Sequence, residues 1–257
     1  MVEAHGRGLQ LTAAGGILLE HADELYSRWE EIRAELLATD PALIGTLRLC
    51  GFSTAVAALL PQVAARVRAV HPRCTVRIIE ADPDECFDLL LAGQADIAVV
   101  VAISSLPPRS DPRFDQASLL EDPLDLLVPD EHPLAGRASV LLSAAADEPW
   151  ILDRPGRPLH QVVQSACAAA GFAPMVAHEV AEWDAGAALV DAGLRVSLIP
   201  RLARVPAGYR ITRVPLRGDP TPARHLSTGT RGGSGRQPMT ATALAALRGA
   251  ATGAVAG

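Results

Sequence analysis

The feature that most constrains this chain is a long helical segment near its start, at residues 12–40. Thr12 is a suitable N-cap, because its hydroxyl can accept a hydrogen bond from a free backbone N–H one turn on. Pro41 ends the segment, because proline disfavours a helical backbone in the residue before it. An apolar stripe with alternating spacings of four and three runs along this helix: Leu18, Ala22, Leu25, Trp29, Ile32 and Leu36. The spacing is typical of a helix that packs lengthwise against another helix.

This helix could pair with a second copy of itself or pack on its own domain. It would extend on the order of 40 Å at about 1.5 Å per residue. Charged residues surround the stripe and keep it narrow, which favours pairing with another helix over covering a broad domain core. We therefore expect a dimerisation helix, with packing on its own domain as the alternative.

The rest of the chain alternates short apolar strands with helices. Strands are expected at residues 46–50, 75–80 and 96–101, and helices at 53–71 and 83–92. A second set follows a proline-rich connection at 104–108, with strands at 118–120, 124–128, 150–152, 175–180, 196–199, 210–216 and 224–230 and helices at 159–170, 184–192 and 239–248. Alternation of this kind predicts the α/β class, arranged as two lobes with crossings near residues 101–105 and 208–214.

Composition narrows the classes of function. The net charge is −6 and the sequence pI is near 5.6, which argues against a nucleic-acid footprint over the whole surface. No apolar run reaches the roughly 18 residues of a membrane span, and the start lacks the order of a secretory signal. We therefore predict a cytoplasmic protein without a membrane partner. The cysteines lack metal-ligand spacing and are expected to be buried free thiols: Cys50, Cys74, Cys86 and Cys167.

The first part of the chain resembles the wing and linker helix of LysR-type transcriptional regulators. The resemblance is carried by HGRGLQLTAAGGILLEHADELYSRWEEIRAEL, in which residues 11–15 match the family's Leu-Thr-x-x-Gly helix start, with Ala14 where proline is common. It implies that residues 1–11 are the remnant of a winged helix-turn-helix and that a recognition helix would come before them. Arg7 at the wing tip is then a DNA-contact candidate. A wing alone cannot specify a site, so weak, nonspecific DNA binding is expected of these 257 residues.

Three later segments resemble the effector-binding domain of the same family. They are GTLRLCGFSTAVAALLPQVAARVRAVHP, LLLAGQADIAVV and LVDAGLRVSLIPRL. The resemblance implies a two-lobed fold like that of periplasmic binding proteins. Lobe I would comprise residues 45–103 and 209–250, and lobe II residues 104–208, joined to the linker and dimerisation helix at 12–40.

A ligand of such a domain is expected beyond the carboxyl ends of the strands, near helix N-termini. In lobe I, Ser53 and Thr54 could cap a helix and also bind an anionic effector, or only cap it. The other candidates lie at strand ends or helix starts: Val101, Ala102, Ile103, Asp153, Arg157, His160, Ala181, Trp183 and Pro200. Arg157 or His160 would meet a ligand charge, and Pro200 faces the cleft by resemblance. Trp183 would form an apolar wall or simply pack.

The sequence therefore predicts a LysR-type regulator that senses a small, possibly anionic effector as a homodimer or homotetramer. The full-length protein would bind DNA. The alternative is a stand-alone solute-binding protein, against which the long helix and the missing signal peptide argue. An enzyme, cofactor or metal is not expected, because G-x-S-x-G, H-E-x-x-H and phosphate-loop motifs are absent. Acidic pairs such as Asp122 with Asp125 are interpreted as turn and cap carboxylates.

Overall fold

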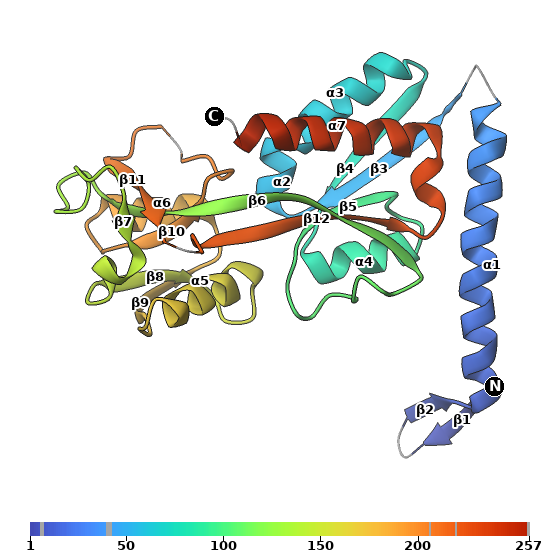
Figure 1. Ribbon diagram of the computed structural model, residues 1–257, viewed down its shortest axis with the longest axis horizontal. Coiled ribbons are helices and arrows are strands. Elements are labelled where there is room, and N and C mark those ends of the chain that lie inside the picture. Colours follow the sequence, from blue (N-terminus) through green and yellow to red (C-terminus); the bar gives the residue numbers. More distant parts are fainter. Residues whose placement is uncertain (6–7, 40–42, 206, 219, 256–257) are drawn as a thin grey trace. The chain divides into compact units, whose positions relative to one another are not determined.

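The computed structural model describes residues 1–5, 8–39, 43–205, 207–218 and 220–255 (Figure 1). The chain forms two compact units. Unit 1 comprises Met1–Val100, Ser104–Ser118 and Ser227–Gly253, and unit 2 comprises Val101–Ile103, Leu119–Leu226 and Ala254–Gly257. The fold is mixed α/β, as predicted. In the part of the chain that the structure describes, no helix is long and apolar enough to cross a membrane.

Unit 1 begins with a hairpin and the long helix. Strands β1 (Val2–His5) and β2 (Gly8–Leu11) pair antiparallel, and α1 spans Ala13–Ala38. The Thr12 hydroxyl accepts a hydrogen bond from the Gly15 N–H at 3.1 Å, so the predicted N-cap is confirmed. Thr39 is the C-cap residue, and the Asp40-Pro41 stop lies outside the described residues.

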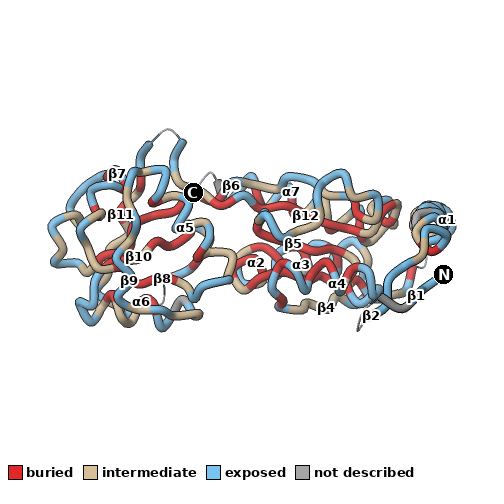
Figure 2. Tube along the Cα trace, turned by 90° about the horizontal axis from the view of Figure 1, so that it is seen from below, coloured by how far each residue is buried: buried red, intermediate tan, exposed pale blue. Residues whose placement is uncertain are grey.

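The body of unit 1 is built on a parallel sheet. Its strands β3 (Gly45–Gly51), β4 (Cys74–Glu80) and β5 (Ile97–Val101) pair in the order β4-β3-β5. The helices of this unit are α2 (Ser53–Ala58), α3 (Leu60–Val70), α4 (Pro83–Leu91) and α7 (Pro238–Val255). A short 3₁₀ helix, Ser234–Arg236, precedes α7. Strand β5 is buried along its whole length, and each of the four helices also contributes buried residues to the core (Figure 2).

The helix expected at residues 53–71 is in fact two helices, α2 and α3. Leu59 separates them with φ −110° and ψ −52°. Pro61 follows two residues later, and its ring removes one backbone donor and clashes with the preceding turn. The single helix was therefore a wrong prediction, although the apolar face along it (Leu59, Leu60, Val63 and Val67) is buried as expected.

Unit 2 has a second core around short strands. Its strands are β7 (Val140–Leu141), β8 (Pro149–Asp153), β9 (Met175–Val180), β10 (Ser197–Pro200) and β11 (Ile211–Arg217), and its helices are α5 (Pro158–Ala169), α6 (Trp183–Asp191) and the 3₁₀ helix Leu142–Ala145. Trp150 is fully buried at the centre, with Leu126, Leu198 and Val214 in the same cluster. The indole N–H of Trp150 donates to the Ala145 carbonyl at 3.2 Å.

Two long strands contain residues of both units. Strand β6 spans Phe114–Pro129 without interruption, and β12 spans Ala223–Arg231 beside it. The strands expected at 118–120 and 124–128 are in fact parts of this one strand, because residues 121–123 continue it and do not turn the chain. Along β6 and β12 the chain changes unit after Ser118 and after Leu226. The crossings expected near residues 101–105 and 208–214 stay predictions.

Candidate functional site

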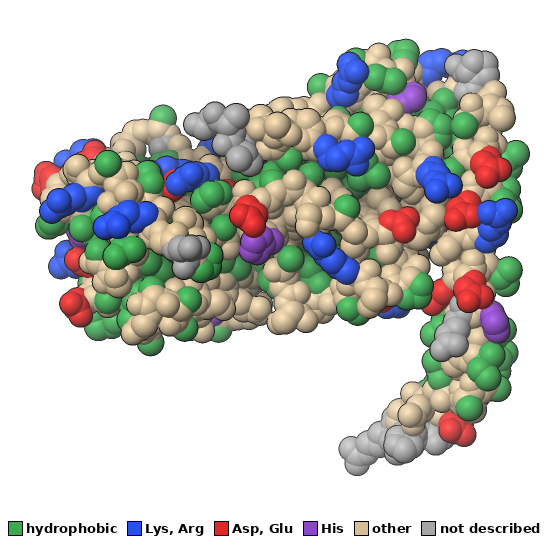
Figure 3. Space-filling model, in the orientation of Figure 1, with side chains coloured by type: hydrophobic (Ala, Val, Ile, Leu, Met, Phe, Trp, Pro, Cys, Tyr) green, Lys and Arg blue, Asp and Glu red, His purple; other side chains and the backbone are tan. Residues whose placement is uncertain are grey.

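Helix α1 carries two faces of different character. The predicted stripe is open to solvent: Leu25 is 71% exposed, Trp29 54% and Leu36 60%, and Leu18 and Ile32 are also exposed. Hydrophobic and acidic side chains are both visible along the helix in Figure 3. A second face, with Ser27, Glu30 and Ala34 at helical spacing, contacts the body of unit 1 instead. Helix α1 thus packs on its own domain through polar and small residues and leaves the apolar stripe uncovered.

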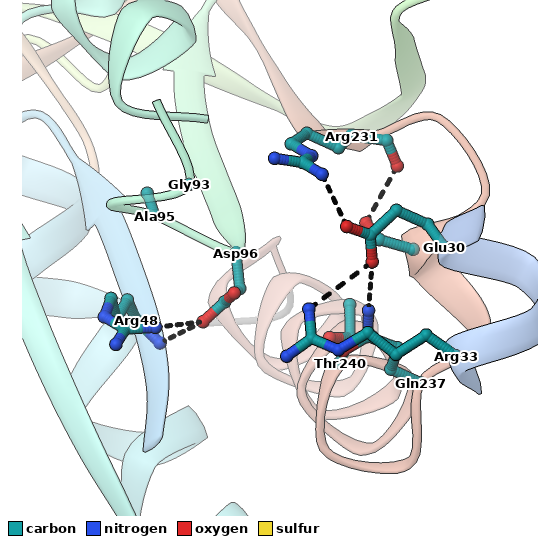
Figure 4. Close-up of a pocket in the computed structure, with 10 residues that line it drawn as sticks. Glu30, Arg33, Arg48, Gly93, Ala95, Asp96, Arg231, Gln237 and Thr240 are labelled. Carbon is teal, nitrogen blue, oxygen red and sulfur yellow. Dashed lines mark hydrogen bonds and ion pairs between the residues drawn. The ribbon is translucent and has the colours of Figure 1, made fainter. Parts of the chain in front are cut away.

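Glu30 is the centre of the contact between α1 and the body of unit 1 (Figure 4). Its side chain is only 4% exposed. Arg231 donates to one carboxylate oxygen through Nη2 at 2.5 Å, and Gln237 donates to the other through Nε2 at 2.7 Å. Arg33 Nη1 lies 3.6 Å from Glu30 Oε2. The Arg231 guanidinium also lies over the Tyr26 ring, with its Cζ 5.2 Å from the ring centre. The carboxylate is therefore buried with its charge compensated.

Two cavities flank this carboxylate. One, of about 120 Å³, is lined by polar groups that include Arg48 and Asp96 (Figure 4). The Asp96 carboxylate accepts from the Arg48 backbone N–H at 2.7 Å, but its burial outweighs this and raises its pKa. The other, of about 210 Å³, is lined in part by Tyr26, Leu91 and Arg113. Sequence reasoning missed these groups, because nothing distinguishes Glu30 from the other acidic residues of the helix.

The unit 1 effector candidates are Ser53 and Thr54. Helix α2 begins at Ser53, and Phe52 is the cap residue without a side-chain cap hydrogen bond. The capping role expected of Ser53 or Thr54 is therefore wrong, since both are already helical. Thr54 is 3% exposed, and its hydroxyl has no hydrogen-bond partner among the described residues. A buried hydroxyl without a partner is unusual and costs free energy, roughly 1–3 kcal/mol.

Three of the unit 2 candidates lie together. Asp153 ends β8, and Arg157 and His160 lie at the start of α5. The Arg157 Nε–H donates to Asp153 Oδ2 at 3.2 Å, and the His160 Nδ1–H donates to the Asp153 carbonyl oxygen at 2.7 Å. Burial raises the pKa of Asp153, and Arg157 opposes that rise. The Arg157 charge, expected to meet a ligand, is thus partly used within the protein.

The other candidates are placed one by one. Val101 is buried at the end of β5, Ile103 is half-buried, and the exposed Ala102 donates its N–H to the His225 carbonyl at 2.8 Å. Ala181 is half-buried, and the buried Pro200 ends β10. Trp183 begins α6, but its side chain lies outside the described residues, as does Arg7. Only Asp153, Arg157 and His160 are linked by hydrogen bonds that the structure records.

Unit 2 also contains a buried ionic network that connects β6 and β12. Asp122 and Arg224 are 1% and 4% exposed, and Arg224 donates to the Asp122 carboxylate at 2.8 Å. The other Asp122 oxygen accepts from the Leu202 N–H at 3.0 Å. Asp125 accepts from Arg201 at 3.0 Å. The interpretation of these acids as turn and cap carboxylates is wrong, because both lie in a strand and hold arginines.

The cysteines are buried free thiols, as predicted. Burial raises the pKa of Cys167 to about 11. The pKa of Cys86 is also raised, first by the neighbouring Cys50 thiol and then by burial. These two thiols therefore remain protonated near neutral pH. Within the described residues, no group of three or more His, Cys, Asp or Glu side chains is placed to hold a metal ion.

The fold defines the class of this protein: a two-lobed α/β domain that follows a long helix. Residues 41–252 match the family model for the LysR substrate binding domain. The chain therefore belongs to the LysR family of transcriptional regulators.

Known relatives agree with this assignment. The chain is 30% identical over 240 residues to a probable hydrogen peroxide-inducible genes activator of Mycobacterium avium, covering 92% of this chain and 75% of that protein. Among solved structures, the Corynebacterium glutamicum OxyR C206 mutant has a TM-score of 0.72 at 23% identity. This match covers 99% of the present chain and 78% of the OxyR chain. The BenM effector-binding domain with its effector benzoate has a TM-score of 0.69 at 22% identity. This match covers 80% of the present chain and 91% of the BenM domain. Both structures have the two-lobed fold.

Proposed function

We propose that this chain is the effector-sensing and dimer-forming part of a LysR-type regulator that acts on DNA in the cytoplasm. A small molecule binds between strand ends and helix starts of the domain, and two or four copies associate through α1. The effector acts only if it binds one quaternary arrangement more tightly than another. Sequence-specific DNA contact then requires a recognition helix besides Arg7.

One observation supports this proposal above the others: α1 keeps its apolar stripe in solvent although a domain surface lies beside it. Large exposed apolar residues in a continuous row are characteristic of an interaction surface. A stand-alone solute-binding protein does not need such a helix to bind its solute. The LysR relatives are regulators, and a regulator that associates through α1 explains both the exposed helix and the domain.

The effector is proposed to be a small molecule and not an oxidant of thiols. Relatives of this chain are named as hydrogen peroxide-inducible genes activators. A thiol that senses peroxide needs thiolate character and access to solvent. Here the four cysteines are buried, and the pKa values of Cys86 and Cys167 are raised. A carboxylate is the favoured class, because BenM binds benzoate on the same fold and His160 and Arg157 lie among the candidates.

Light scattering on size-exclusion fractions tests the quaternary part of the proposal. The wild-type chain should have a mass of two or four times 26.9 kDa, and Leu25→Glu should shift it to a single 26.9 kDa chain. Glutamate is a good helix former, so this change removes the apolar contact without breaking the helix. Met175→Glu, at another exposed apolar position, serves as the control and should leave the mass unchanged. A monomeric wild-type chain would refute the proposal.

A further inference from the structure

The turn after β12 touches the polar face of α1 so closely that only glycine fits there. Gly233 has φ +79°, and a Cβ on it would lie 2.4 Å from the Ser27 carbonyl oxygen. A Cβ on Gly232 would lie 2.7 Å from the Ser27 hydroxyl. A real Cβ does not come this close to other heavy atoms. Gly232 and Gly233 therefore let the turn and the helix come into direct backbone contact.

The same turn is tied to both of the long strands. Strand β12 ends at Arg231, one residue before the turn. The Gly232 N–H donates to the Arg113 carbonyl at 2.8 Å, and the Gly233 N–H donates to the Asp115 carboxylate at 3.0 Å. Asp115 is the second residue of β6. The start of β6 and the end of β12 thus meet at one point, and that point contacts α1.

Glu30 adds a directional attachment to this contact. Its two oxygens are bound by Arg231 at the end of β12 and by Gln237, the residue before α7 (Figure 4). If the helix leaves this position, both hydrogen bonds of Glu30 break and the partly buried Arg231 loses its counter-charge. The contact therefore has one preferred arrangement and is not a loose apolar patch.

We propose that Glu30, Arg231 and the Gly232-Gly233 turn form a joint that fixes α1 to the ends of the two long strands of its own chain. We call this group the helix joint. It makes α1 a helix with two interaction surfaces: the apolar stripe for a second copy and the polar face for unit 1. Since Arg231 ends β12 and the start of β6 is hydrogen-bonded to the Gly232-Gly233 turn, a displacement of either strand is passed to α1 through the joint. A role of the helix joint in regulation rests on the proposed function. The contacts that form the joint do not depend on that proposal.

Spin-label distances test the joint directly. Labels are attached to Glu24→Cys on α1 and Ala245→Cys on α7, both exposed positions of unit 1. The native thiols are buried, so the labels are directed to the new cysteines. Labelled chains are mixed with an excess of unlabelled chains, so that the distance measured by pulsed electron resonance is within one chain. The joint predicts a single narrow distance distribution.

Charge variants then separate the joint from general packing. Glu30→Arg should abolish the narrow distribution, and the double variant Glu30→Arg with Arg231→Glu should restore it, because the pair is re-formed with reversed charges. Glu35→Gln, which neutralises an exposed carboxylate of the same helix, is the matched control and should change nothing. A broad distribution in the wild type, or an unchanged one in Glu30→Arg, would overturn the proposal.

Two further measurements keep this result distinct from the proposed function. Light-scattering mass and circular dichroism are recorded for every variant. A dimeric, folded Glu30→Arg protein with a broad distance distribution supports the joint and leaves the apolar stripe intact. A monomeric wild type with a narrow distribution would refute the dimer proposal while supporting the joint.

Discussion

At the scale of single residues, the most deeply buried carboxylates among the described residues are each paired with an arginine. Asp122 and Glu30 both lie below 5% exposure, and each is bound by an arginine from the two ends of β12. Burial lowers the pKa of Arg224, and the Asp122 charge opposes that shift. Such pairs need not stabilise the fold more than apolar residues would, but losing one member leaves an uncompensated charge.

This asymmetry gives the first prediction. Arg224→Met should lower the free energy of unfolding by about 3–5 kcal/mol, because Asp122 is then buried without its counter-charge. Urea denaturation measures it. Arg217→Met, at an exposed position of β11, should change the free energy little. The double variant of Asp122→Leu with Arg224→Met should recover much of the loss, and a double variant as unstable as Arg224→Met alone would contradict the explanation.

The buried thiols give the second prediction. With a pKa of about 11, only about one Cys167 side chain in a thousand is a thiolate at pH 8. The folded protein should therefore react with Ellman's reagent far more slowly than the urea-unfolded chain, which should release four thiol equivalents. Hydrogen peroxide should likewise leave the native thiol count unchanged. Rapid oxidation of a cysteine in the folded protein would refute the choice of a small-molecule effector over peroxide.

At the scale of elements, regular patterns were predictable and pairings across the chain were not. The Thr12 cap and the apolar stripe of α1 depend on spacings within one helix, so the sequence alone reveals them. The burial of Glu30 depends on Arg231, which lies 201 residues away. The path of β6 through Pro123 likewise depends on Asp122 meeting Arg224, 102 residues further on. Local propensity favours a turn there, and the distant partner overrides it.

The candidate site shows the same division. Asp153, Arg157 and His160 lie close in sequence at the end of one strand and the start of one helix, so their contact follows from local structure. Helix α2 already begins at Ser53 with Phe52 as its cap residue, so Ser53 and Thr54 lie in the first turn and not at the cap. The unpartnered Thr54 hydroxyl could not be predicted, because burial of one atom depends on the packing of the whole unit.

The contact between the glycine turn and α1 gives the third prediction. Gly233→Ala should destabilise unit 1 in two ways: alanine is strained at φ +79°, by roughly 1–2 kcal/mol, and its Cβ meets the Ser27 carbonyl. Gly193→Ala is the matched control, since Gly193 has φ +75° but open space around the position of a Cβ. Urea denaturation should show a larger loss for Gly233→Ala. Equal losses in the free energy of unfolding would mean that helix α1 does not closely contact the Gly232-Gly233 turn.

At the scale of the whole molecule, effector binding should be measurable as an increase in the stability of the folded protein. Any molecule that binds the folded protein and not the unfolded chain stabilises it, by about 2.7 kcal/mol at a concentration of 100 Kd. Thr54 of unit 1 and Arg157 of unit 2 are separate effector candidates, and a ligand that binds the folded protein at either of them should raise its melting temperature.

The fourth prediction uses the unpartnered Thr54 hydroxyl as a signature. In a melting assay with benzoate and other small carboxylates, at least one should raise Tm, and Thr54→Val should reduce that shift. Without ligand, Thr54→Val should itself melt at or above the wild-type temperature, because it removes a buried group that lacks a hydrogen bond. The unit 2 candidate is tested separately: Arg157→Ala should reduce the shift of a ligand that binds at the start of α5, whereas Arg154→Ala, a neighbouring exposed arginine, should keep it. If Thr54→Val lowers Tm without ligand and keeps the full ligand shift, the hydroxyl belongs to the packing of unit 1 and not to the effector site.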